Sequence, residues 1–185
     1  MVNDWFSTSA PGGFYRIHGI AKALHDLGNH AKRPDAWFLF VRDGRPLDSL
    51  SLQSKEVGLS LSVTFTGRVP RNELPGLCAR MDIGLSLKPF QGRRTIGTFP
   101  QKIPEYIAVG CVPVSRPLQE AHNIISHRMN GVIAEVDAMA EAVVSLLDDY
   151  LARERMSRKA AESARERYDW DCLVKGLLHF WEEPV

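Results

Sequence analysis

The stretch that decides the fold is DIGLSLKPFQGRRTIGTFPQKIPEYIAVGCVPV, residues 82–114. It opens with the short apolar run Asp82–Leu87 and, after a loop, shows a helical pattern over Gln101–Val109. A glycine ends that pattern, and a second apolar run, Cys111–Val114, follows at once. Two parallel strands cannot be joined by a tight turn and need a crossover, usually a helix. The stretch therefore predicts one strand–helix–strand unit of a parallel sheet.

The same alternation continues outward from this unit in both directions. Further strands are expected at Trp37–Val41, Val63–Thr66 and Gly131–Ala134. Further helices are expected at Ile17–Leu27, Leu50–Val57, Arg71–Met81, Ala138 to about Arg167 with one break, and Cys172–Trp181. Short strands that alternate with helices predict a doubly wound, Rossmann-like α/β fold with C-terminal helices packed against the sheet.

Two places depart from this regular pattern. Residues 1–13 are poorly patterned and predict no strand, so we expect the α/β domain to span residues 14–185. Pro113 lies inside the run at Cys111–Val114. Because proline cannot donate a hydrogen bond to a neighbouring strand, Pro113 predicts that this strand does not occupy a central position.

Composition excludes several classes of protein. Lysine and arginine total 23 against 22 acidic residues, and this balance disfavours a dedicated nucleic-acid-binding protein, which carries a basic excess. The three cysteines, Cys78, Cys111 and Cys172, are too few and too scattered for a disulfide framework or a zinc site. No apolar run approaches the roughly 18 residues of a membrane-spanning helix, and the N-terminus lacks a signal-peptide pattern. We therefore expect a cytoplasmic protein without a metal.

The loop after Leu87 is the first candidate for chemistry. No acidic residue lies between Asp82 and Glu105, whereas the interval carries four basic residues, Lys88, Arg93, Arg94 and Lys102. Parallel sheets bind ligands outside the carboxyl ends of their strands, and the first turn of a helix attracts anions through its unpaired N–H groups. A basic, glycine-containing loop that leads into a helix is therefore suited to a phosphate group. A solvated surface loop is the alternative, and the loop alone does not decide between them.

Glu105 is the second candidate, because it lies near the start of the helix that follows the loop. A carboxylate can accept hydrogen bonds from two neighbouring hydroxyls, such as a ribose diol. The same residue could simply complement the helix dipole. The residue by itself leaves both roles open.

The string from Phe99 to Val114 resembles the donor-binding segment of GT-B glycosyltransferases of the group 1 type (family 4). That family shows Pro-x-Lys-x-x-Glu-Tyr-Met-Ala-x-Gly-x-Pro-Val. This chain matches it at Pro100, Lys102, Glu105, Tyr106, Ala108 and Gly110, and then, with one additional residue after the glycine, at Pro113 and Val114. Other segments resemble the family in the right order: Tyr15–Leu24, Val63–Val69, Met81–Ile83, Gly131–Ile133 and Tyr168–Trp170. The resemblance spans about Gly13 to Trp181.

The resemblance implies a retaining transferase domain that binds a nucleotide-sugar, with UDP, GDP or ADP as the nucleotide, and needs no metal or other cofactor. It implies that Glu105 holds the ribose hydroxyls and that the loop after Thr66 lines the base. The binding residues that it implies are His18, Gly67, Arg68, Val69, Gly97, Thr98, Phe99, Lys102 and Glu105. His18 stands where the family usually has a lysine that helps neutralise the diphosphate, and histidine is a weaker cation at neutral pH.

Two departures from the family bear on activity. Gly97 stands where the family often has a second glutamate, so no catalytic residue is assigned. The chain is also about half the family's length and lacks the N-terminal acceptor domain, so we expect the isolated chain to bind donor without transferring sugar. An acceptor lobe, a partner subunit or a second copy would cover an apolar patch expected at Leu177, Leu178, Phe180 and Trp181. The alternative is a non-catalytic nucleotide-sugar-binding subunit or a degenerate fragment. Peripheral association with the inner face of a membrane also stays open.

Overall fold

The computed structural model describes residues 2–4, 36–41, 51–52, 54–56, 62–87, 100–172 and 174. Within these ranges the strands form one six-stranded sheet in the order β3-β2-β1-β4-β5-β6. Every pair of neighbouring strands is parallel. The strands are β1 (Val2–Asp4), β2 (Phe38–Phe40), β3 (Val63–Phe65), β4 (Ile83–Ser86), β5 (Val112–Ser115) and β6 (Val132–Ile133). This order, which reverses between β1 and β4, is that of a doubly wound sheet, and the predicted fold class is confirmed.

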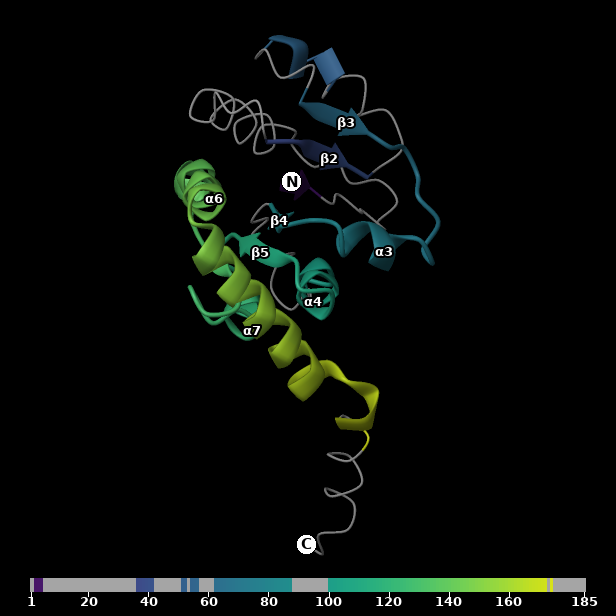
Figure 1. Cartoon of the computed structure of the whole chain (residues 1–185), viewed down its shortest axis with the longest axis vertical. Coiled ribbons are helices and arrows are strands. Elements are labelled where there is room, and N and C mark those ends of the chain that lie inside the picture. The colour runs from purple at the N-terminus through teal and green to yellow at the C-terminus, as the bar shows by residue number, and fades with distance from the viewer. Residues whose placement is uncertain are drawn as a thin grey trace, which may run out of the picture.

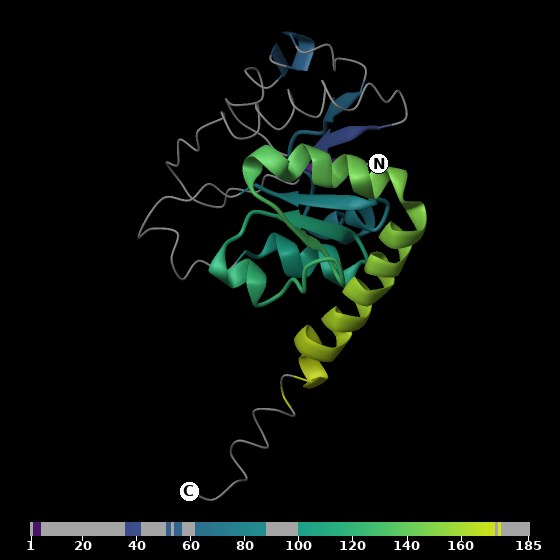
Figure 2. The same cartoon turned by 90° about the vertical axis from the view of Figure 1, so that its left-hand side faces the viewer.

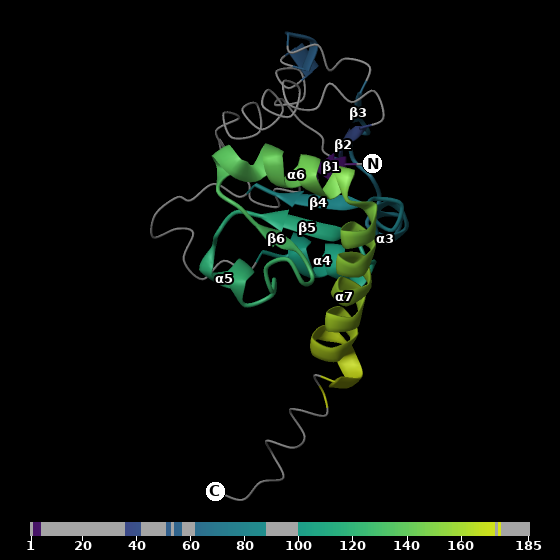
Figure 3. The same cartoon turned by 60° about the vertical axis from the view of Figure 1, so that its left-hand side comes forward.

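Helices cover both faces of this sheet (Figure 3), with α6 over one face of β4 and β5 and α4 against the other. The helices in the described ranges are α3 (Leu74–Cys78), α4 (Lys102–Ala108), α5 (Gln119–His122), α6 (Met139–Asp148) and α7 (Tyr150–Tyr168). A short 3-10 helix, η2 (Val136–Ala138), precedes α6. After α6 the chain turns sharply and α7 runs away from the sheet (Figure 2). The predicted helix with one break from Ala138 to Arg167 is therefore confirmed, and the break lies at Asp149.

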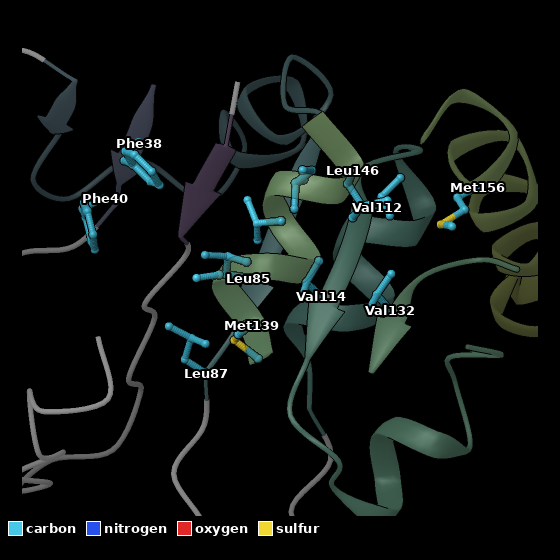
Figure 4. Packing of buried hydrophobic residues seen from close by; sticks show 13 residues of the cluster. Phe38, Phe40, Leu85, Leu87, Val112, Val114, Val132, Met139, Leu146 and Met156 are labelled. Atoms are coloured by element: carbon cyan, nitrogen blue, oxygen red, sulfur yellow. The ribbon is translucent and has the colours of Figure 1, made fainter. Parts of the chain in front are cut away.

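The face under α6 holds the main apolar core. Alternate residues of the central strands point to this face, among them Phe38, Phe40, Ile83, Leu85, Val112 and Val114. Met139 and Leu146 of α6 reach the side chains from β4 and β5 (Figure 4). Phe40 also stacks on Phe65 of the edge strand β3, with ring centroids 5.1 Å apart. Among the described residues, apolar side chains therefore close this face over the central strands.

The opposite face is closed by α4, α5 and α7. Ile103 and Ile107 of α4 pack with Ala160 and Ala164 of α7 in a second buried cluster. The two alanines let α7 approach α4 closely, because they place no long side chain between the helix axes. The buried amide of Asn130 ties the preceding loop to this helix, since its Nδ2 donates to the Ser163 hydroxyl at 3.1 Å. The position of α4 is thus determined from the sheet side and from the α7 side.

One central strand escaped the sequence analysis. The prediction that residues 1–13 contain no strand is wrong, because Val2–Asp4 forms β1 between β2 and β4. Val2 pairs with Phe38 on one side and with Ile83 on the other. The strand has three residues, two of them polar, and so shows neither an apolar run nor an alternation. Its pairing with two neighbours, and not its own composition, makes it a strand.

Pro113 also differs from expectation, because β5 lies between β4 and β6 and is not an edge strand. Its neighbour Val112 donates its N–H to Asp82 on the β4 side. Successive residues of a strand turn their N–H groups to opposite sides, so the nitrogen of Pro113 faces the β6 side. Pairing with β6 begins only at Val114. The missing donor of Pro113 therefore faces a position where no ladder hydrogen bond is required.

Several smaller expectations have clear outcomes. The helix predicted over Arg71–Met81 is shorter, because Pro75 is tolerated only in a first turn and α3 therefore begins at Leu74. The patch expected at Leu177–Trp181 and the helix expected at Ile17–Leu27 lie outside the described residues. Among the described residues, no helix is long and apolar enough to cross a bilayer.

Candidate functional site

The candidate site lies where the carboxyl ends of the parallel strands meet the first turn of α4. The β3 strand ends at Phe65 and leads into Gly67–Val69, and β5 ends at Ser115. Helix α4 lies beside β5 (Figure 1) and connects the parallel strands β4 and β5. It must therefore run back along the sheet, which puts its N-terminus at the same edge. This is the edge at which open parallel sheets bind ligands.

The loop after β3 is held at its start and turns at a glycine. The backbone N–H of Thr66 donates to the carbonyl of Phe40 at 3.0 Å, which ties the loop to β2. Gly67 has a φ of +69°, a conformation that side chains with a Cβ rarely adopt. Space does not require a glycine there, because a Cβ would meet nothing within 4 Å. The turn leaves Arg68 exposed and Val69 half-buried.

Helix α4 separates its buried and exposed positions by helical spacing. Ile103, Tyr106 and Ile107 are fully buried and occupy one face. Lys102 is half-buried and Glu105 is exposed. Pro104 lies in the first turn, where the absence of its N–H costs no helical hydrogen bond. Burial of the apolar face therefore directs Lys102 and Glu105 away from the core at the start of the helix.

The Glu105 carboxylate is not used to cap its own helix. No side chain caps α4, and within the described part of the chain Glu105 makes no side-chain hydrogen bond or ion pair. Partial shielding from solvent raises the pKa of this carboxyl, while the positive charges of Arg71 and Lys102 act in the opposite direction. The Glu105 charge in turn contributes, after burial, to raising the pKa of the Cys78 thiol to about 12. Glu105 is thus a partly desolvated carboxylate on which the charges of Arg71 and Lys102 act.

A small buried cluster joins the β3–α3 loop to α4. Tyr106, Cys78 and Cys111 form its centre, and Val69 and Leu74 pack against it from the loop and from α3. This cluster therefore links Val69 of the predicted Gly67–Val69 segment to the helix that carries Glu105. The predicted site residues His18, Gly97, Thr98 and Phe99 lie outside the described residues.

Two polar features of this edge escaped the sequence analysis. Arg71 follows the predicted base loop and acts on Glu105 electrostatically. Arg116 comes directly after β5, and its backbone N–H donates to the carbonyl of Ser86 at 3.4 Å. The signal that identifies Arg116 is simple: it is the first charged residue after a fully buried strand, and therefore lies at the carboxyl edge.

A hollow elsewhere on the surface does not compete with this site for an anionic ligand. It lies on α6 and is lined by Glu141, Val144, Ser145, Asp148 and Asp149. Three acidic side chains would repel a phosphate group. Within the described residues, no group of three or more histidine, cysteine or acidic side chains is arranged to hold a metal ion.

Comparison with known proteins identifies the family. Residues 10–149 match the family model described as "Glycosyl transferases group 1". No sequence among the curated proteins matches this chain significantly.

Solved structures show the same fold. HepE of Anabaena in complex with UDP superposes with a TM-score of 0.75 at 22% identity, over 97% of this chain and 48% of that one. TarM of S. aureus gives 0.75 at 15% identity, over 98% of this chain and 35% of that one. The C-terminal domain of the group 1 family protein LpcC of Francisella tularensis superposes with a TM-score of 0.70 at 20% identity, over 91% of this chain and 86% of that one.

This chain thus spans about half of the HepE chain but most of the LpcC C-terminal domain. The chain belongs to the group 1 glycosyl transferases and has the fold of the C-terminal, Rossmann-like lobe of a GT-B enzyme.

Proposed function

We propose that this chain binds the nucleotide-sugar donor of a retaining glycosyltransferase, with the Glu105 carboxylate accepting hydrogen bonds from the ribose diol. The observation that carries the proposal is the state of Glu105. It lies in the first turn of a helix at the carboxyl edge, is partly desolvated, and neither caps the helix nor forms an ion pair in the described residues. A carboxylate without a structural partner is available to a ligand.

The neighbouring groups suit the rest of a nucleoside diphosphate. The loop Gly67–Val69 packs against the same cluster as α4 and would line the base. Arg68 and Lys102 supply positive charge for the diphosphate, as does the N-terminus of α4. We extend the proposal to His18 and to the backbone of Gly97, Thr98 and Phe99. HepE, which shares the fold, has been solved with UDP and with UDP-glucose, and this favours a UDP-sugar as the first donor to test.

Transfer itself needs an acceptor held beside the donor in a site that excludes water. In our proposal a second lobe supplies that acceptor site, either from an N-terminal domain, a partner subunit or a second copy of this chain. The 185-residue chain alone then binds donor but transfers no sugar at a useful rate. A non-catalytic donor-binding subunit is the second candidate function, favoured by Gly97 at the position of the family's second glutamate.

Thermal denaturation with UDP-, GDP- and ADP-glucose tests the binding proposal. A donor present at about 100 times its dissociation constant adds about 2.7 kcal/mol of stability, which raises the melting temperature by roughly 5–10 °C for a chain of this size. Glu105→Gln should abolish most of that rise, because the amide keeps the shape of the side chain but loses the charge. Glu154→Gln on the exposed side of α7 is the matched control and should respond like the wild type.

The outcomes separate clearly. If none of the three donors raises the melting temperature of the wild-type chain, the proposed function is wrong. A Glu105→Gln variant that responds as strongly as Glu154→Gln shows that donor binds elsewhere. Robust transfer by the purified chain alone, with donor and acceptor supplied, contradicts the requirement for a second lobe.

A further inference from the structure

We infer that Tyr106 is a positioning residue that holds Glu105 in place, through its hydroxyl on the carbonyl of Leu85 and its ring on Gly84. The inference rests on the proposed function, because it concerns the carboxylate that binds the ribose there. It adds to the proposed site a residue, Tyr106, that does not contact the ligand and acts through Glu105.

The hydroxyl makes a directed contact with the strand. Tyr106 is fully buried, and its Oη donates to the backbone carbonyl of Leu85 at 3.1 Å. Leu85 belongs to β4, between β1 and β5 in the sheet. A carbonyl oxygen has two lone pairs and can accept from a side chain in addition to its ladder partner. The bond therefore connects the first turns of α4 to the centre of the sheet.

The ring makes an equally specific contact. A Cβ on Gly84 would lie 2.5 Å from two ring carbons of Tyr106, so only glycine in β4 allows the ring to lie there. Gly84 leaves a gap in the face of the sheet that the aromatic ring fills. The ring determines how closely α4 approaches the strand, and the hydroxyl determines its direction along the strand.

The two contacts of Tyr106 with β4 matter for the site because of where they lie. Glu105 is the residue before Tyr106, so a shift of the tyrosine moves the carboxylate by a similar amount. Leu85 lies three residues before Lys88, at the start of the basic segment that leads to α4. One hydrogen bond thus links the strand from which that segment leaves to the helix at which it ends. The Tyr106 cluster also holds Val69 from the predicted base loop.

A phenylalanine would fill the same space, which makes the hydroxyl testable without disturbing the core. Tyr106→Phe should weaken UDP-glucose binding by up to about fivefold, because the net contribution of one buried hydrogen bond limits how much the alignment of Glu105 can depend on it. Ser163→Ala is the matched control, because it also removes one hydrogen-bonded hydroxyl, from α7 and away from the candidate site. It should lower the melting temperature similarly and leave the affinity unchanged.

A double-mutant cycle provides the measurement that a purely structural role would not affect. If Tyr106 acts through Glu105, then Tyr106→Phe weakens binding in the wild-type background but not in a Glu105→Gln background. The affinities are measured by titration calorimetry with UDP-glucose, at a temperature where all four proteins are folded.

Each outcome is informative. A wild-type chain that does not bind UDP-glucose, GDP-glucose or ADP-glucose overturns the proposed function and the positioning role together. If the wild type binds normally, two results overturn the positioning role alone. In the first, Tyr106→Phe leaves the affinity unchanged; in the second, it lowers the affinity equally in the wild-type and Glu105→Gln backgrounds. A loss of affinity that disappears in the Glu105→Gln background supports it.

Discussion

The helices α4 and α7 both have an acidic residue at their start, but only α7 is capped by it. At the start of α7, the Asp149 carboxylate accepts a hydrogen bond from the N–H of Ala152 at 2.8 Å and caps the helix. At the start of α4, Glu105 caps nothing. A carboxylate that caps a helix accepts hydrogen bonds from its free N–H groups. The comparison therefore separates an acid that caps its helix from one that has no side-chain partner in the described residues.

The largest effect on stability is expected from disrupting the contact between the Tyr106 ring on α4 and Gly84 on β4. Gly84→Ala would place a methyl group against the buried ring of Tyr106, and overpacking of this kind costs about 1–3 kcal/mol. Because the ring must move, donor binding should weaken as well. Urea denaturation and donor titration measure the two effects.

Gly76→Ala is the control for that substitution, because a Cβ there meets nothing within 4 Å. In the helix α3 it should be neutral or slightly stabilising. A Gly84→Ala protein as stable as Gly76→Ala would show that α4 is not held by this contact.

The next effect separates the two acids by ligand binding. Glu105→Ala should weaken donor binding about tenfold to a hundredfold, as expected for losing hydrogen bonds to a charged group. Its melting temperature should stay near that of the wild type, since the side chain has no structural partner in the described residues. A large loss of stability without loss of binding would assign Glu105 to the same class as Asp149.

The converse is expected at α7. Asp149→Ala should reduce the free energy of unfolding by about 1 kcal/mol through loss of the N-cap. Donor affinity should not change, because this helix start adjoins the end of α6, on the sheet face opposite α4 (Figure 3). Parallel urea and calorimetric measurements on both variants give the complete comparison. An Asp149→Ala protein with weakened binding would mean that the two helix starts are coupled.

The smallest effect concerns pH. The pKa of Glu105 is raised in the folded chain, chiefly because its carboxyl is partly desolvated. A carboxyl with a raised pKa binds its proton more tightly when folded, so the ionised form is the less favourable one. Stability should therefore decline slightly as pH rises through the window just above the ordinary carboxyl value, and Glu105→Gln should lack that decline. Melting curves between about pH 4 and 6 measure the difference. A wild type whose stability rises more steeply than that of the variant would reverse the sign.

An element could be predicted from the sequence when the pattern that indicates it lies within a few neighbouring residues. The helix over Gln101–Val109 and the strand at Asp82–Leu87 were predictable, because apolar runs and helical spacing lie within a few residues. Glu105 was predictable as a candidate for the same reason, through the motif around it. The contribution of Arg71 was not, because it depends on how the β3–α3 loop packs against α4.

The sequence by itself determined the alternation of strands and helices, and with it the parallel sheet, since each apolar run must be buried and each connection must cross over. Only the tertiary structure decided that Val2–Asp4 is the central strand, because its two polar residues carry no pattern of their own and depend on pairing with β2 and β4. It also decided that Pro113 can lie in an inner strand, since β6 begins one residue later. The tertiary structure also decided whether the Glu105 carboxylate has a hydrogen-bond or ion-pair partner, because that depends on the residues that the fold brings near it.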